Sequence, residues 1–178
     1  QDNGEWLCDV IRNGKNYDAG HNFIAFLNFK INECFDMSQK GSDIRFKIFE
    51  AVSELASMLE QREKSDESLR DLSICYENIG IVSMLLGGES NLAKAREMYE
   101  KSLDIRKFLA LEKRIPGSSC DLSVSCFKLG EVYEACGGRE NLELALKMYK
   151  KALGIDKILA RVQGTSENRR VLSVTYER

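Results

Sequence analysis

The chain has 178 residues, of which 43% are hydrophobic and 30% charged, and its formal net charge is -2, from 26 basic and 28 acidic residues. This balance gives no general attraction to nucleic acid or to an anionic membrane, so neither is an expected partner. No apolar run approaches the ~20 residues that a membrane-spanning helix needs. The single proline is typical of a chain made of long helices.

The six cysteines form no CxxC pair, and only one histidine could join them as a metal ligand. The usual zinc motifs are therefore missing, and we expect neither a metal nor another cofactor. Cys75, Cys126 and Cys136 fall within helical patterns, where cysteine behaves as a small buried hydrophobic residue. Reduced, structural thiols favour a reducing compartment, which points to the cytoplasm.

The sequence repeats itself every 50 residues. Residues 71–113 align with residues 121–163 without a gap, and 18 of the 43 aligned positions are identical. A repeat of this length predicts an all-α fold, an α–α superhelix or solenoid of stacked helix-turn-helix units, rather than a globular enzyme. We refer to the first helix of each unit as helix A and to the second as helix B.

The N-terminal part of the chain follows the repeat only weakly. Residues 1–20 fit no frame and have no assigned structure. Residues 21–64 are interpreted as a degenerate unit, with a diverged helix A over 21–36 and a helix B over 44–62. Five apolar residues fall on helix-B positions when the frame is moved back by 50: Ile48, Phe49, Val52, Leu55 and Leu59.

Residues 65–117 and 118–164 form the two full units. Helix A is expected from about 70 to 86 and from about 120 to 136, and helix B from about 91 to 113 and from about 141 to 162. Apolar residues at three- and four-residue spacing predict the buried face of helix A. In the two units these are Leu72, Cys75 or Tyr76, Ile79 and Val82, and then Leu122, Cys126, Leu129, Val132 and Tyr133.

Turn and cap signals mark the helix ends. The serines of Ser68-x-x-Asp71 and Ser118-x-x-Asp121 are expected to cap helix A. The pairs Gly87-Gly88 and Gly137-Gly138 are expected to end it, because glycine adopts positive φ without steric cost. Candidate caps of helix B are Ser90 or Asn91 in the first unit and Asn141 in the second.

Helix B presents an inner face with small residues that allow a neighbouring helix to approach closely. The inner positions are Leu92, Ala95, Tyr99, Ser102, Ile105 and Leu109, and then Leu142, Ala145, Tyr149, Ala152, Ile155 and Leu159. Arg106 and Lys107 are expected on the solvated face, because acidic residues alternate with them. Residues 165–178 are expected to begin a further repeat or to cap the stack as a short helix.

These positions resemble the tetratricopeptide repeat, in the long-repeat variety of kinesin light chain and of many bacterial repeat proteins. The second unit carries the family pattern at Cys126, Leu129-Gly130, Tyr133, Gly137, Ala145, Tyr149 and Ala152. The departures are a loop between helices A and B that is three residues longer, a longer helix B, and cysteine in place of the early aromatic residue. The resemblance implies a scaffold that binds a peptide or protein segment on the concave helix-A face, without catalysis.

The resemblance also implies which side chains line this face. They are Glu77, Asn78, Ile81 and Met84 in the first full unit, and Phe127, Lys128, Glu131 and Glu134 in the second. Shifting Asn78 by 50 residues in each direction gives a column of Asn28, Asn78, Lys128 and Arg178. Ile81 and Phe127 either anchor a partner side chain or pack against a neighbouring helix A.

Two alternatives to peptide binding remain open. The chain could be the regulatory or sensor part of a larger signalling protein or enzyme, or it could self-associate through its last unit. His21, the only histidine, has no partner placed beside it by any motif, so a general base is not expected there. No phosphate-binding loop is present, because Gly87-Gly88 follows a helix and lacks the GK[ST] ending.

Overall fold

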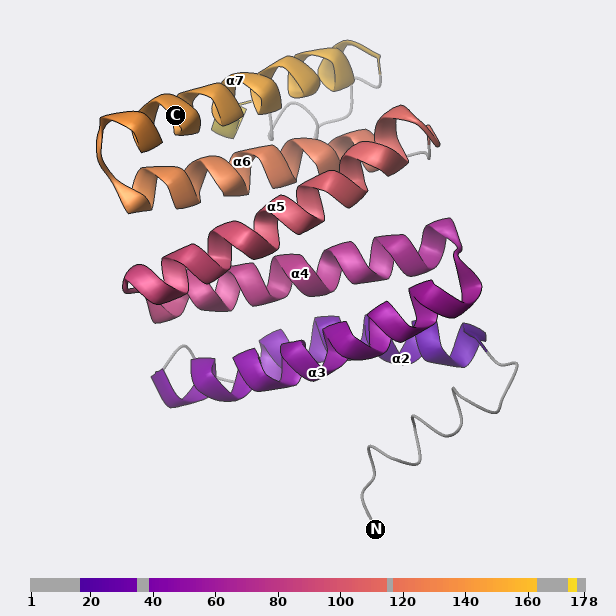
Figure 1. Cartoon of the computed structure of the whole chain (residues 1–178). Coiled ribbons are helices and arrows are strands. Elements are labelled where there is room, and N and C mark those ends of the chain that lie inside the picture. Colours follow the sequence, from indigo (N-terminus) through magenta and orange to yellow (C-terminus); the bar gives the residue numbers. More distant parts are fainter. Residues whose placement is uncertain (1–16, 35–38, 115–116, 163–172, 176–178) are drawn as a thin grey trace. The chain divides into compact units, whose positions relative to one another are not determined.

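The computed structural model describes residues 17–34, 39–114, 117–162 and 173–175, and every regular element in these ranges is helical. The helices are α2 (Tyr17–Cys34), α3 (Gln39–Glu63), α4 (Asp66–Leu86), α5 (Glu89–Leu111), α6 (Ser118–Cys136) and α7 (Arg139–Val162) (Figure 1). The all-α prediction is therefore confirmed for the described residues. Residues 1–16, and most of the segment expected to start a further repeat, lie outside them.

The chain divides into two compact units, residues 1–86 with α2, α3 and α4, and residues 87–178 with α5, α6 and α7. In the N-terminal unit, α3 packs along α4, and α2 contacts both of them. The core of this unit includes Ile24 of α2, Phe49 and Leu59 of α3, and Ile79 and Val82 of α4, all of them fully or almost fully buried. The alternation of three and four residues along each helix thus produces one shared apolar interior.

In the C-terminal unit, α6 lies between α5 and α7 and packs against both (Figure 1). Its apolar face is buried as expected, and Cys126 and Leu122 meet Ala110 of α5 and Ala152 of α7. Gly130 is required for the approach of α7, because a Cβ atom there would lie 2.5 Å from Cε1 of the Tyr149 ring. The glycine and the small residues of helix B therefore set how closely these helices pack.

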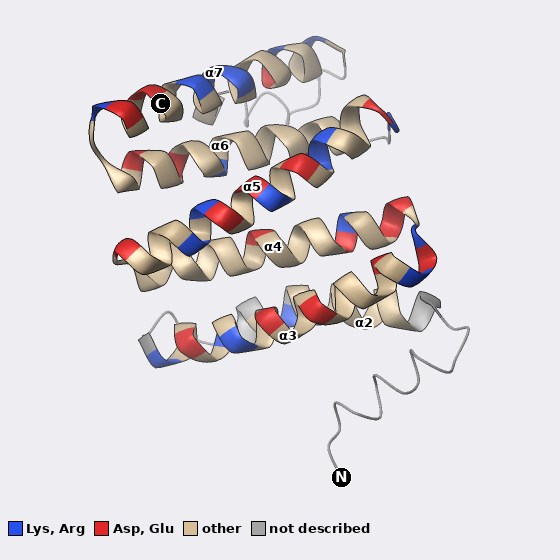
Figure 2. Cartoon of the chain, viewed as in Figure 1, with Lys and Arg blue, Asp and Glu red and all other residues tan. Residues whose placement is uncertain are grey.

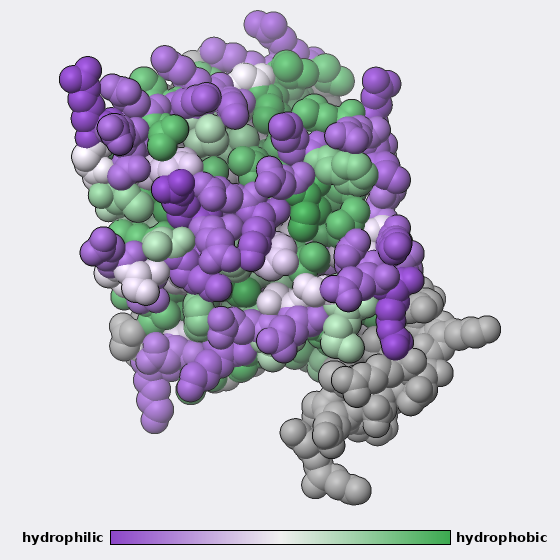
Figure 3. All heavy atoms as spheres, viewed as in Figure 1, coloured by the Kyte–Doolittle hydropathy of each residue, from purple (hydrophilic) through white to green (hydrophobic). Residues whose placement is uncertain are grey.

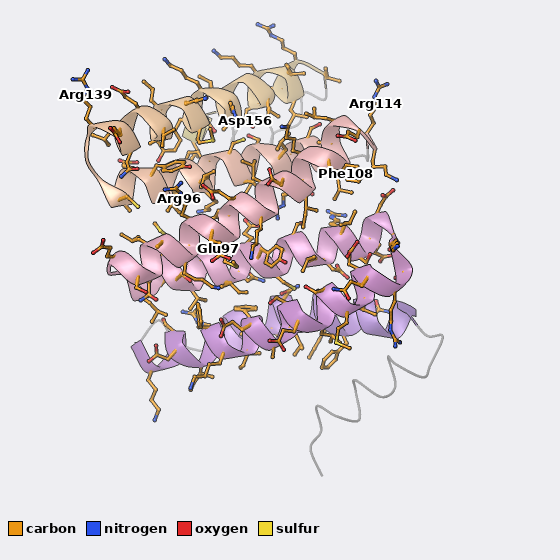
Figure 4. All side chains as sticks on the ribbon, in the orientation of Figure 1. Arg96, Glu97, Phe108, Arg114, Arg139 and Asp156 are labelled. Atoms are coloured by element: carbon orange, nitrogen blue, oxygen red, sulfur yellow. The ribbon has the colours of Figure 1, made fainter. Side chains whose placement is uncertain are left out.

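One contact between helix B and the next helix A occurs twice, at positions 50 residues apart. Arg106 of α5 donates from Nη1 to Ser125 Oγ of α6 at 2.9 Å, across a sequence separation of 19. Asp156 of α7 accepts from Thr175 Oγ1 at 2.7 Å, across the same separation of 19. Figure 4 shows Asp156 between α7 and α6, where it also accepts a hydrogen bond from Ser123 Oγ. Arg106 is thus 5% exposed, and its expected place on the solvated face is wrong.

The turn between helices A and B is also repeated in atomic detail. Gly87 and Gly137 have φ values of 65° and 66°, so the expected glycine stops are confirmed. Asn91 Nδ2 donates to the carbonyl of Gly87, and Asn141 Nδ2 donates to the carbonyl of Gly137, each at 2.8 Å. The asparagines therefore satisfy the carbonyl of the glycine that directly follows helix A. Their expected role as N-caps of helix B is wrong, because helix B begins two residues before each of them.

The expected capping boxes of helix A are wrong as well. Helix α4 begins at Asp66, and Ser65 and Ser68 exchange hydrogen bonds, from Ser68 N to Ser65 Oγ at 3.0 Å and from Ser65 N to Ser68 Oγ at 3.2 Å. The capping pair is therefore three residues earlier than the sequence pattern indicates, and this leaves Asp71 available for a tertiary contact. Helix α6 is preceded by Gly117, with no side-chain hydrogen bond at its cap.

Two expected core residues lie at the surface. Leu142, near the start of α7, is 51% exposed, and Cys136, the last residue of α6, is exposed as well. Cys75 and Cys126 are buried as expected. Both surface residues lie beside the turn between α6 and α7, where no described helix covers them.

Candidate functional site: a polar ladder between α2 and α4

Two asparagines at equivalent positions of the repeat contact each other in the N-terminal unit. Asn78 Nδ2 of α4 donates to Asn28 Oδ1 of α2 at 2.9 Å, across a sequence separation of 50. Both side chains are more than 90% buried. Asn28 also lies within hydrogen-bonding distance of the Cys75 thiol, with Nδ2 3.6 Å from Sγ. Helices α2 and α4 are therefore side by side in the register that the 50-residue period predicts.

A second contact with the same separation lies two helical turns earlier. His21 Nδ1 of α2 is 2.6 Å from Asp71 Oδ2 of α4, again 50 residues away. The other ring nitrogen, Nε2, is 2.7 Å from Glu63 Oε2 at the end of α3. Because seven residues separate His21 from Asn28, both contacts lie on one face of the helix. We call His21, Asn28, Glu63, Asp71 and Asn78 the polar ladder.

The two carboxylates determine the charge state of the histidine. Burial lowers the pKa of His21, but the hydrogen bonds and charges of Asp71 and Glu63 outweigh it and leave that pKa above its ordinary value of 6.5. The two carboxylates thus favour the imidazolium form more than water does, and the ring on α2 contacts the ends of both α3 and α4 through them. Glu67 and Arg70 of α4 are the further charged groups that act on Asp71.

This arrangement favours a structural role over catalysis. Both ring nitrogens of His21 are held by carboxylates, so a substrate proton could be removed only after one of these bonds is broken. Burial raises the pKa of the Cys75 thiol to about 12, which keeps this nearby sulfur protonated and unreactive. The ladder is thus built to hold helices in register.

The other residues expected to line the helix-A face of α4 lie closer to solvent. Glu77, Ile81 and Met84 are partly exposed, whereas Asn78 is 7% exposed and engaged with Asn28. Asn28 and Asn78 are therefore neighbours, as the column predicts, but they form a buried hydrogen-bonded pair and are not exposed to a ligand. Its last member, Arg178, lies outside the described residues.

On α6 the expected residues are engaged with each other or with α7. Lys128 Nζ is 3.0 Å from Glu131 Oε2. Glu134 accepts a hydrogen bond of 2.7 Å from the hydroxyl of Tyr149. Phe127 is half-buried and packs against the Tyr149 ring, with the centroids 5.4 Å apart. Of the two roles left open for Phe127, the structure shows packing, and its partner is helix B of its own unit.

The ion-paired half of the ladder does not follow from local sequence patterns. The spacing of Ser68 and Asp71 favours a capping box, and His21 has no matching motif among the residues near it in sequence. A signal is nevertheless present in the repeat itself, because His21 and Asp71 are separated by one period. Position 21 carries histidine where positions 71 and 121 both carry aspartate, so a search for identical residues does not detect such a pair.

Comparison of the chain with known protein families, with curated proteins and with solved structures finds no match. The described helices also include none with the length and apolar character needed to cross a membrane. Within the same described ranges, no three His, Cys, Asp or Glu side chains are grouped so that they could hold a metal ion. The described residues define an all-helical protein in which two successive helices are twice joined by a glycine pair, at Gly87-Gly88 and at Gly137-Gly138.

Proposed function

We propose that this chain is a protein-interaction module whose repeats form an α–α superhelix of the tetratricopeptide type. It binds an extended peptide or protein segment along the helix-A face. The observation that carries the proposal is the hydrogen bond between Asn28 and Asn78, because it aligns two successive helices A at equivalent positions. Aligned helices present the same side-chain position at regular intervals, which suits the regular backbone of an extended peptide.

Under this proposal, the buried asparagines hold the helices in register and their neighbours meet the ligand. On the helix-A face of α4 the partly exposed members are Glu77, Ile81 and Met84, and on the helix-A face of α6 they include Lys128 and Glu131. They combine apolar contact area with both signs of charge. Such a surface recognises a segment by a few side chains, while the backbone of the segment follows the helices.

A selection from a random peptide library tests the proposal. The immobilised chain is expected to enrich a peptide motif, and the selected peptide is expected to bind at least about tenfold more weakly to Glu77→Lys/Lys128→Glu. The matched control is Asp104→Lys/Lys107→Glu, which makes the same charge exchange at exposed positions of α5. No enriched motif, or equal binding by both double variants, would count against this function.

A further inference from the structure

The ring of His21 lies between two carboxylates that belong to different helices. Its Nδ1 atom is 2.6 Å from Asp71 Oδ2 of α4, and its Nε2 atom is 2.7 Å from Glu63 Oε2 of α3. An ionised carboxylate accepts hydrogen bonds and donates none, so both contacts are hydrogen bonds only when the ring carries two N–H groups. A ring that has lost one proton can donate to only one of the two carboxylates.

The two carboxylates differ in their access to water. The side chain of Asp71 is 12% exposed, whereas that of Glu63 is 25% exposed. Glu63 is also the last residue of α3, next to the turn that leads into α4. Figure 2 shows acidic and basic residues together at this turn, and Figure 3 shows hydrophilic side chains over the same end of the unit. Glu63 can therefore rotate into water, while Asp71 stays enclosed between α2 and α4.

The remaining ring proton stabilises the contact with Asp71 more than the contact with Glu63. Burial is the largest influence on Asp71 and raises the pKa of its carboxyl, so its charge needs a hydrogen-bond donor. Glu63 can obtain such donors from water. Its charge lies at the carboxyl end of α3, where the helix dipole disfavours an anion unless a positive charge is close. A neutral His21 no longer supplies that positive charge.

Other charged groups near the ring have a smaller influence. Asp71 and Glu63 are the charged groups that act on His21. Glu67 and Arg70 of α4 act on Asp71 with opposite signs. Besides His21 itself, the charged side chain that the structure describes on α2 is Lys30, about two and a half turns away. The contact therefore depends mainly on the ring and its two carboxylates.

We propose that His21 is a proton-dependent lock between α2 and α3. With two N–H groups, the ring ties α2 to α3 through Glu63 and to α4 through Asp71. When Nε2 gives its proton to water, Glu63 turns into solvent and the N–H at Nδ1 remains on Asp71. The amides of Asn28 and Asn78 do not titrate, so α2 stays in register on α4. A rise in pH thus frees α2 from the end of α3, and this does not depend on peptide binding.

Nitrogen NMR of the wild-type chain tests which proton is lost. Because the chain has one histidine, its two ring-nitrogen signals need no separation from others. Above the midpoint of the His21 titration, the neutral ring is expected to carry its proton on Nδ1, the less common tautomer of histidine in water. A neutral ring with its proton on Nε2 would overturn the proposal, because Glu63 would then be the retained partner.

Urea denaturation of two variants tests the consequence for the helices. Below pH 6.5, Glu63→Gln is expected to raise the equilibrium constant for unfolding at least about fivefold. Above the wild-type midpoint it is expected to have no such effect, because the glutamine amide can donate to the bare Nε2 atom. Asp71→Asn is expected to raise the constant on both sides of the midpoint.

The matched control is Glu54→Gln, which makes the same substitution at an exposed position of α3. Its effect on the unfolding constant is expected to be the same below and above the midpoint. An equal effect of Glu63→Gln at both pH values would overturn the lock, because Glu63 would then contribute regardless of the ring proton.

Discussion

Asn78 on α4 donates a hydrogen bond of 2.9 Å to Asn28 on α2, one full repeat earlier in the sequence. The two amides are buried, so the bond forms where water cannot replace it. It therefore fixes the position of one helix along the other, whereas apolar contacts alone allow small shifts. His21 and Asp71 repeat this relationship two turns away.

The asparagine pair is expected to show energetic coupling. Asn28→Leu or Asn78→Leu alone removes the hydrogen bond between two buried amides, which is expected to cost roughly 1–3 kcal/mol of unfolding free energy. The double variant removes both amides, and its loss is expected to be smaller than the sum of the two by about 1 kcal/mol. Urea denaturation of the four proteins measures the coupling. Additive losses would show that the bond contributes nothing beyond packing.

The ion-paired histidine predicts how stability depends on pH. The folded-state pKa of His21 is raised above 6.5, so its stabilising contribution is complete below pH 6.5. The contribution is lost as the pH rises through the raised folded-state pKa. In His21→Asn this decline in unfolding free energy is expected to be absent, and the hydrogen-bond loss itself is expected to cost roughly 1–3 kcal/mol.

Urea denaturation of both proteins over a pH series that begins below 6.5 and extends into the alkaline range measures the difference. Because the chain has one histidine, its proton NMR signal also gives the midpoint directly, and we expect that midpoint above 6.5. Parallel stability curves for the two proteins, or a midpoint at or below 6.5, would contradict the assignment.

Two glycines of the C-terminal unit are expected to respond in opposite ways to alanine. Gly130→Ala places a Cβ 2.5 Å from the buried Tyr149 ring and is expected to destabilise the protein by roughly 1–3 kcal/mol. A Cβ at Gly154 in α7 would meet no neighbouring atom within 4 Å, so Gly154→Ala is expected to stabilise by up to about 1 kcal/mol. Thermal unfolding compares the variants. An equal shift in Tm would disprove the close packing of α6 and α7.

Buried Arg106 predicts a graded loss of stability. Arg106→Ala removes the hydrogen bonds to Ser125 Oγ and to the Asp121 carbonyl, together with the aliphatic stem, and is expected to cost about 2–3 kcal/mol. Arg106→Met retains apolar contact and is expected to cost less. Lys107→Ala at the exposed neighbouring position should change the unfolding free energy by no more than about 0.5 kcal/mol. Chemical denaturation tests this order, and an equal effect of Arg106→Ala and Lys107→Ala would contradict it.

Apolar spacing in the sequence predicts that the helices form, but it does not predict the residue at which each helix begins. The presence of the helices and the buried face of helix A follow from apolar spacing, since residues such as Ile79 and Leu129 can leave water only on one side of a helix. The exact caps do not follow from it. Ser65, Ser68 and Asp71 all favour a helix start, and the identity of the cap depends on which hydroxyl reaches a free amide.

The candidate site, too, follows only in part from the sequence. The period places Asn28 and Asn78 in one column, but it does not indicate that they are buried. Arginine is a residue type that usually lies at the surface. Arg106 can be buried because Ser125 Oγ and the Asp121 carbonyl of α6 accept hydrogen bonds from its guanidinium group. Exposure of a polar side chain is a property of the packed neighbours, which the local sequence does not specify.

The sequence by itself determined that the chain is helical and has a 50-residue period. The spacing of apolar residues and the positions of glycines are enough for this, because each affects the backbone only within a few residues. The tertiary structure decided which polar side chains meet. His21 pairs with Asp71 and Glu63, and Asp156 pairs with Ser123 and Thr175. These choices depend on distances between groups far apart in the chain, and such distances exist only once the helices pack.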